Sequence, residues 1–204
     1  MNELFGWSEA TWHLIDQIGI LLGLLMGVSW IVGLPLALLK REDIRRWFTR
    51  NRFPNVGAEL ENALRWDALA FTVSHKELPL WVIGTLKPTH IGLIATEASR
   101  DTAREIDTYA RQRGIDVLTA HLADPDDPAE ARAQTRLILT RLREAGAERI
   151  AVDITGGKTP MSLGAFMAAE ELGVSSLYVT SDYDAALRRP DMRTAKIHCI
   201  SKPE

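Results

Sequence analysis

The N-terminal part of the sequence contains a long apolar run that has no counterpart later in the chain. Residues 18–39 carry no charge, and 13 of these 22 residues are Leu, Ile or Val. At a rise of about 1.5 Å per residue, a helix of this length extends about 33 Å, which is enough to cross a hydrocarbon core of about 30 Å. The pattern therefore predicts a single transmembrane helix over residues 18–39.

The charges on the two sides of this run predict its orientation. Residues 1–17 contain three acidic and no basic side chains, whereas residues 40–52 contain six basic and two acidic ones. Positively charged flanks stay on the cytoplasmic side of a membrane. We therefore expect an inner (cytoplasmic) membrane protein with an extracytoplasmic N-terminus over residues 1–17, a juxtamembrane connector over 40–65 and a cytoplasmic domain over 66–204.

Three glycines repeat every four residues within the run. Gly19, Gly23 and Gly27 share one face of a helix. Small residues at this spacing let two helix backbones approach closely in lipid. The spacing favours association of the helices, and therefore a homo-oligomer.

After residue 66, short apolar runs alternate with longer amphipathic segments. Near-continuous apolar runs are typical of parallel strands buried on both faces, and the segments between them are typical of the covering helices. This alternation predicts an α/β domain with a Rossmann-like, doubly wound, mostly parallel sheet and helices on both faces. The expected strands are 68–73, 90–95, 116–122, 150–154, 175–180 and 196–200, and the expected helices are 77–86, 99–113, 127–145 and 159–172.

The predicted fold also predicts where a ligand binds. In an open α/β sheet, ligands bind outside the carboxyl ends of the strands, at the point where the strand order reverses. The loops expected at that edge are residues 74–76, 96–99, 155–159 and 180–183.

Composition narrows the chemistry of this domain. Residues 53–204 carry 18 basic and 22 acidic side chains, which argues against direct binding of DNA or long RNA. The lone Cys199 excludes a disulfide framework and a cysteine zinc cage. The five histidines show no close pair of the kind that binds metal. We therefore expect neither a metal nor a cofactor.

The clearest motif is a strand, a glycine turn and a helix over residues 150–164. Gly156 and Gly157 permit positive φ and let a ligand approach the backbone. The backbone amides of residues 157–159 come at a predicted helix N-terminus, which is a ready anion site. Lys158 adds a cation, and the hydroxyls of Thr155 and Thr159 flank it. The motif predicts that this loop binds phosphate.

Two common nucleotide-binding loops are excluded here. In a P-loop, the position held by Val152 would have to be glycine. The glycine spacing of dinucleotide-binding loops, G-x-G-x-x-G, is also absent.

The same motif resembles that of a known family. Asp153-Ile-Thr-Gly-Gly-Lys-Thr-Pro-Met161 resembles the signature of CARF (CRISPR-associated Rossmann fold) domains, which usually reads N/D-x-T-G-G-T-K-x-M. Ala70–Pro79 is similar to the first strand and loop of that family, and Leu93–Thr96 to the second. The resemblance extends from about Ala68 to Ile200. With a membrane helix ahead of it, the whole chain resembles the membrane-anchored CARF effectors of type III CRISPR antiviral defence.

This resemblance implies a ligand and its contacts. The ligand would be a cyclic oligoadenylate second messenger, with cyclic tetra-adenylate favoured. Lys158 and Thr159 stand in the reverse of the family's usual order, and the Glu97 carboxylate is expected either to contact a base or to face away from the phosphates. The implied ligand-binding residues are Ser74, His75, Thr96, Glu97, Thr155, Gly156, Gly157, Lys158 and Thr159, and strand order alone adds Thr180 and Ser181.

Three outputs remain open from the sequence. No catalytic residues are assigned, because Arg193 and His198, which have a ribonuclease-like spacing, fall where a loop is expected to enter a strand. The first hypothesis is that ligand binding to a CARF dimer rearranges the membrane helices of a tetramer or larger oligomer into a pore and depolarises the membrane. The second is a ring nuclease in which Ser74, Thr155 and Lys158 position the ligand for self-cleavage. The third is an anchored sensor that recruits a partner.

Overall fold

The computed structural model describes residues 9–33, 35, 51–52, 65–184 and 189–203. The chain divides into two compact units, Met1–Phe48 and Thr49–Glu204. Most of the predicted connector over 40–65, the whole segment before Glu9 and most of the predicted span beyond Gly33 lie outside the described residues.

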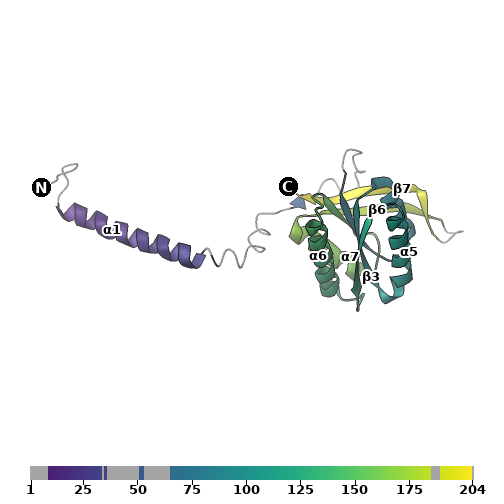
Figure 1. Cartoon of the computed structure of the whole chain (residues 1–204), viewed down its shortest axis with the longest axis horizontal. Coiled ribbons are helices and arrows are strands. Elements are labelled where there is room, and N and C mark those ends of the chain that lie inside the picture. Colours follow the sequence, from purple (N-terminus) through teal and green to yellow (C-terminus); the bar gives the residue numbers. More distant parts are fainter. Residues whose placement is uncertain (1–8, 34, 36–50, 53–64, 185–188, 204) are drawn as a thin grey trace. The chain divides into compact units, whose positions relative to one another are not determined.

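The first unit contains one long apolar helix. Helix α1 spans Glu9–Val28, and a π-helical segment, η2, continues it over Ser29–Gly33 (Figure 1). By length and composition this helix is long and apolar enough to cross a membrane, and none of its apolar window is buried. The helix begins nine residues before the predicted span, because acidic side chains at Glu9 and Asp16 interrupt an apolar pattern without interrupting helical hydrogen bonding.

The second unit is built on a sheet in the order β1-β7-β6-β5-β2-β3-β4. Strands β2 to β6 run parallel to one another. β7 is antiparallel to β6, and β1 is antiparallel to β7. The parallel part follows the doubly wound order, with its reversal between β2 and β5. The strands are β1 Asn51–Arg52, β2 Ala68–Thr72, β3 His90–Thr96, β4 Asp116–Leu122, β5 Ile150–Asp153, β6 Ser175–Asp184 and β7 Arg189–Pro203.

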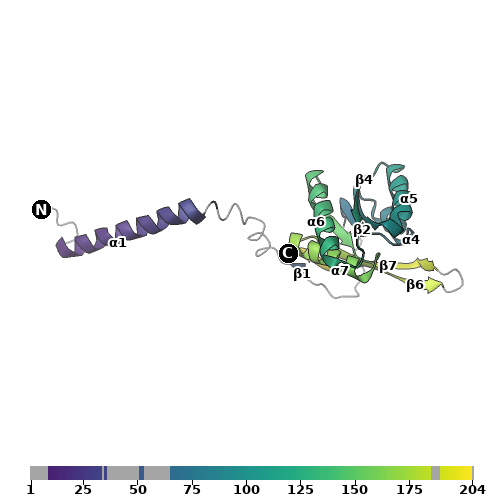
Figure 2. The ribbon, with the colours of Figure 1, turned by 90° about the horizontal axis from the view of Figure 1, so that it is seen from below.

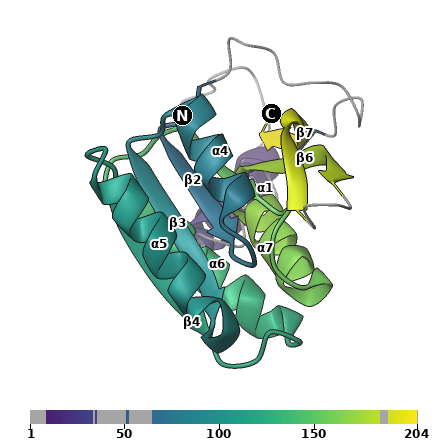
Figure 3. The same ribbon diagram turned by 90° about the vertical axis from the view of Figure 1, so that its right-hand side faces the viewer.

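Helices cover both faces of this sheet, so the predicted Rossmann-like fold is confirmed. Figure 1 shows α6 and α7 on one side and α5 on the other, and Figure 3 shows α4 next to α5. Leu69 and Phe71 of β2 pack on the α4–α5 side, whereas Ala68 and Ala70 pack on the α6–α7 side. The helices are α4 Glu77–Leu86, η3 Glu97–Ser99, α5 Arg100–Arg111, α6 Pro128–Glu144 and α7 Thr159–Leu172.

The prediction of a loop over residues 180–183 is wrong, because this segment belongs to β6. β6 pairs with β5 only over Ser175–Leu177 but stays paired with β7 as far as Asp184. The two strands therefore continue as an exposed ribbon past the rest of the sheet (Figure 2). A ribbon without a helix over it has no continuous apolar run, so the pattern that identified the central strands could not extend into it.

Candidate functional site

The predicted ligand site lies at the carboxyl ends of β2 and β5, which are neighbours in the middle of the sheet. Their order reversal places the segment after β2, including Ser74, next to the segment after β5, Ile154–Lys158. Val73 donates its backbone N–H to Ile94 O at 2.9 Å, which holds the end of β2 against β3. The two segments therefore form the base of one site.

A buried carboxyl group holds the segment after β5 in place. Asp153 is 3% exposed, and its Oδ1 accepts the backbone N–H of Thr155 at 2.8 Å as well as the Thr155 hydroxyl. The Thr155 Oγ1 in turn accepts the Val179 N–H at 2.7 Å, which ties the segment to β6. Burial raises the pKa of Asp153 to about 6, although the hydrogen bonds from Thr155 lower it. The predicted ligand hydroxyl of Thr155 is thus already engaged inside the protein.

Gly156 is where the two segments touch. A Cβ at this position would lie 2.1 Å from the Thr72 carbonyl oxygen and 3.5 Å from Ser74 Oγ, so only glycine fits. The Gly156 carbonyl accepts the hydroxyls of Thr72 at 2.6 Å and Ser162 at 2.9 Å. Since a trans peptide points its C=O and N–H in opposite directions, these two bonds turn the following N–H, that of Gly157, away from Thr72 and Ser162.

The next amides have no partner among the residues that the structure describes. Gly157 adopts φ +79°, which favours glycine. Lys158 is the N-cap of α7 and provides no side-chain cap. In the described part of the chain, the N–H groups of Gly157, Lys158 and Thr159 donate no hydrogen bond. Consecutive unpaired amides at a helix N-terminus are suited to bind an anion.

The Lys158 ammonium is held by a carboxylate that the sequence analysis did not single out. Its Nζ lies 2.8 Å from Asp126 Oδ2, in the segment between β4 and α6, and both side chains are more than half exposed. No spacing in the sequence signals this pair, because its members are 32 residues apart and come from different loops. Thr72, which is 84 residues from Gly156, was missed for the same reason, whereas Ser162 lies within the motif itself, six residues from Gly156, and was not singled out.

Four more of the predicted residues lie at the end of β3 or in the segments that follow β2 and β3. Ser74 is half-buried and His75 exposed, and both lie in the segment after β2. Thr96 is buried and forms a capping box with Ser99 through a 2.9 Å bond from its N–H to Ser99 Oγ. Glu97 is exposed and pairs with Arg100, so its carboxylate has a partner of its own.

Thr180 and Ser181 lie within the ribbon rather than in a loop. The Thr180 hydroxyl is 2.8 Å from His198 Nε2 across the β6–β7 pair. Ser181 is half-buried beside it. Within the residues that the structure describes, no cluster of three or more His, Cys, Asp or Glu side chains could hold a metal ion.

No protein-family model matches the sequence, and no curated protein matches it. Among solved structures, the chain is similar to a type III CRISPR defence DNA nuclease activated by cyclic oligoadenylate, with 21% identity and a TM-score of 0.49 over 65% of this chain and 20% of that one. It is similar to Can2 from Sulfobacillus thermosulfidooxidans in complex with cyclic tetra-adenylate, with 19% identity and a TM-score of 0.49 over 57% and 33% of the two chains.

It is also similar to Csm6 from Enterococcus italicus bound to cyclic hexa-2′-fluoro-hexa-dAMP, with 11% identity and a TM-score of 0.44 over 58% and 34%. The matches thus cover about a third or less of each of these longer chains. With TM-scores below 0.5 and identities below 25%, these likenesses do not show which ligand this chain binds.

Proposed function

We propose that this chain is a membrane-anchored sensor of cyclic oligoadenylate in type III CRISPR antiviral defence. The observation that carries the proposal is the row of unpaired amides at Gly157, Lys158 and Thr159, held at the order reversal of a doubly wound sheet. This row binds the phosphates of the messenger. The resemblance of residues 153–161 to the CARF signature supports a cyclic adenylate as the source of those phosphates.

Symmetry supports a ring with an even number of nucleotides. Two copies of the domain related by a two-fold axis present two identical amide rows. A cyclic tetra-adenylate divides equally between them, with its phosphates on the amides and its adenines in flanking positions. Because the domain carries no net positive charge, these local amides rather than a long-range field provide most of the attraction.

The output of the sensor is the membrane helix. An apolar helix over Glu9–Gly33 with Gly19, Gly23 and Gly27 on one face supports an anchor that packs against copies of itself. Messenger binding reorients the cytoplasmic domains, rearranges an oligomer of at least four such helices and depolarises the membrane. The N-terminus lies on the extracytoplasmic side of the inner membrane and the sheet lies in the cytoplasm.

The ring-nuclease alternative receives no support from the side-chain contacts. Two of its three proposed groups are engaged within the protein, the Thr155 hydroxyl by Asp153 and Val179, and the Lys158 ammonium by Asp126. Incubation of the full chain with labelled messenger separates the two proposals, since linear products would favour cleavage. A pull-down with the full chain tests recruitment of a partner.

The binding step is tested with the full-length protein in uncharged detergent. Calorimetric titration with cyclic tri-, tetra- and hexa-adenylate is expected to give the tightest binding for the tetra-adenylate ring. Lys158→Gln should weaken this binding, whereas Lys87→Gln, at the far end of α4, should not. Absence of binding to all three rings would refute the proposal.

The output step needs a separate measurement in cells. A voltage-sensitive dye should report depolarisation when both the full chain and the messenger are produced. Cells that produce the Lys158→Gln variant should keep their potential longer. An unchanged potential, in the presence of a chain that binds the messenger, would leave a sensor without a membrane output.

A further inference from the structure

A cavity lies at the end of the sheet opposite the amide row, where the parallel strands begin. It has a volume of about 250 Å³ and is lined by residues that precede β2, β5 and β6, by the end of α6 and by the end of β7. A five-residue strand such as β2 extends about 16 Å, so this cavity is well separated from the amide row at the other edge. None of the residues proposed to bind the messenger lines it.

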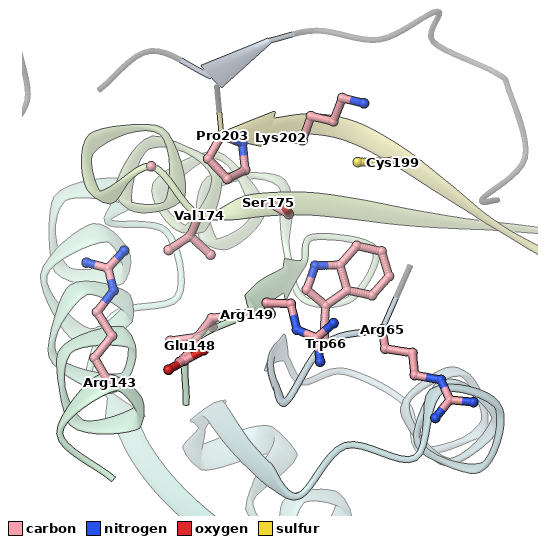
Figure 4. A pocket seen from close by; sticks show the side chains of 12 residues that line it. Arg65, Trp66, Arg143, Glu148, Arg149, Val174, Ser175, Cys199, Lys202 and Pro203 are labelled. Atoms are coloured by element: carbon pink, nitrogen blue, oxygen red, sulfur yellow. The ribbon is translucent and has the colours of Figure 1, made fainter. Parts of the chain in front are cut away.

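The cavity combines an apolar floor with basic side chains. Trp66 is 6% exposed and Val174 is 2% exposed, and both contribute to the lining. In Figure 4 the Trp66 indole lies near the middle of the labelled side chains, with Arg143 on one side and Arg65 on the other. The cavity is smaller than the roughly 300–1,000 Å³ typical of drug-sized ligands, so it suits a small head group rather than a nucleotide.

Four basic side chains and one acidic side chain line this cavity, although the domain as a whole is acidic. Two of the basic groups are fixed by the protein, since Arg149 pairs with Asp67 at 3.0 Å and Arg143 donates to Leu172 O at 2.6 Å. The exposed Arg65 and Lys202 side chains make no hydrogen bond or ion pair with any residue that the structure describes. The acidic side chain of the lining is Glu148.

We propose that this cavity is a binding site for a phosphate ester, whose anionic oxygens pair with Arg65 and Lys202 once these exposed side chains, which extend away from Trp66 in Figure 4, turn toward it, and whose carbon skeleton lies on Trp66 and Val174. Guanidinium and ammonium groups form charge-assisted hydrogen bonds to phosphate. Such an ester is available from the head group of an anionic phospholipid or from a soluble metabolite. The lipid source rests on the membrane anchoring proposed above, whereas the phosphate chemistry does not.

The test uses the full chain in uncharged detergent and needs no cyclic messenger, so its outcome is independent of the proposed function. Calorimetry compares dihexanoyl phosphatidylglycerol, glycerol 3-phosphate and dihexanoyl phosphatidylcholine. We expect the first or both of the first two to bind, with tighter binding of the lipid indicating a membrane source and equal binding a soluble one. The zwitterionic lipid should bind at least about tenfold more weakly, because its choline offsets the phosphate charge.

The double variant Arg65→Gln with Lys202→Gln should weaken phosphate-ester binding at least about tenfold, since it removes two charge-assisted contacts. The matched double variant Lys87→Gln with Arg104→Gln removes the same charge from exposed positions outside the cavity and should change the affinity less than twofold. Unchanged thermal unfolding of both variants shows that they fold. Equal binding by both double variants, equal binding of the three compounds, or no binding of either anionic ester would overturn the proposal.

Discussion

The Lys158 ammonium lies 2.8 Å from the Asp126 carboxylate, and this ion pair joins the segment before α7 to the segment before α6. Asp126 therefore competes with a phosphate for the Lys158 ammonium, the cation that the sequence motif predicts to bind it. Because both side chains are more than half exposed, water and salt screen the pair, and a polyanionic ligand can compete for the lysine.

Removal of Asp126 should therefore strengthen messenger binding. Asp126→Asn frees Lys158 and takes a negative charge away from the incoming phosphates, so we expect about two- to fivefold tighter binding, the range that an exposed ion pair provides. Titration of the full chain with cyclic tetra-adenylate measures it. Asp101→Asn, which removes an exposed carboxylate on α5, is the control and should have no effect. Weaker binding by Asp126→Asn would mean that the ion pair orders the site instead.

Gly156 should tolerate no side chain. A methyl group there would lie 2.1 Å from the Thr72 carbonyl oxygen, and separating the two segments to make room would disrupt the hydrogen bond from the Thr72 hydroxyl to the Gly156 carbonyl. We expect Gly156→Ala to lower the stability of the domain by about 3 kcal/mol, or roughly 10 °C in thermal unfolding. The control is Gly84→Ala on α4, whose added methyl would meet its nearest neighbour, Tyr109, at 3.6 Å and should be neutral or stabilising.

Part of this site was predictable because it is local in sequence. The strand–glycine–helix pattern predicts α7 over Thr159–Leu172 and the amides before it, since each depends on residues within a few positions. The contact of Gly156 with Thr72 and the pairing of Lys158 with Asp126 join segments 84 and 32 residues apart, and no local pattern encodes them. The ribbon containing Thr180 was missed because no helix covers it and its pattern is therefore not apolar.

Thr155 is expected to matter for folding before it matters for binding. Thr155→Val keeps the shape of the side chain but removes its hydroxyl, which leaves the Val179 N–H without an acceptor and Asp153 with one donor fewer. The expected loss is about 2 kcal/mol, the cost of an unsatisfied buried donor. Urea unfolding of the full chain in detergent measures it, with Thr119→Val on an exposed position of β4 as the control. A variant as stable as the parent would show that water replaces the hydroxyl.

The buried carboxyl of Asp153 should make the stability depend on pH. Burial raises its pKa from 3.8 to about 6, so the folded state holds this proton more tightly than the unfolded state. Its contribution is therefore fully present below about pH 4, is lost as the pH rises through about 6, and stays level above that. Asp153→Asn removes the titration. Relative to the parent chain, the variant should gain about 2 kcal/mol of stability between pH 4.5 and pH 7.5. A stability difference independent of pH would place the pKa near its ordinary value.

The glycine face of α1 gives the prediction that separates sensing from output. A Cβ at Gly19, Gly23 or Gly27 would meet no atom within 4 Å in the single chain. A larger side chain there therefore causes no clash within one helix, and it raises the helix propensity of the position. If copies of the helix pack through this face, Gly23→Ile holds their backbones apart and should reduce cross-linked oligomers and messenger-dependent depolarisation several-fold. Messenger affinity should stay unchanged. Leu21→Ile, about 160° around the helix from Gly23, is the matched control, and equal effects of the two substitutions would place the helix contact on another face.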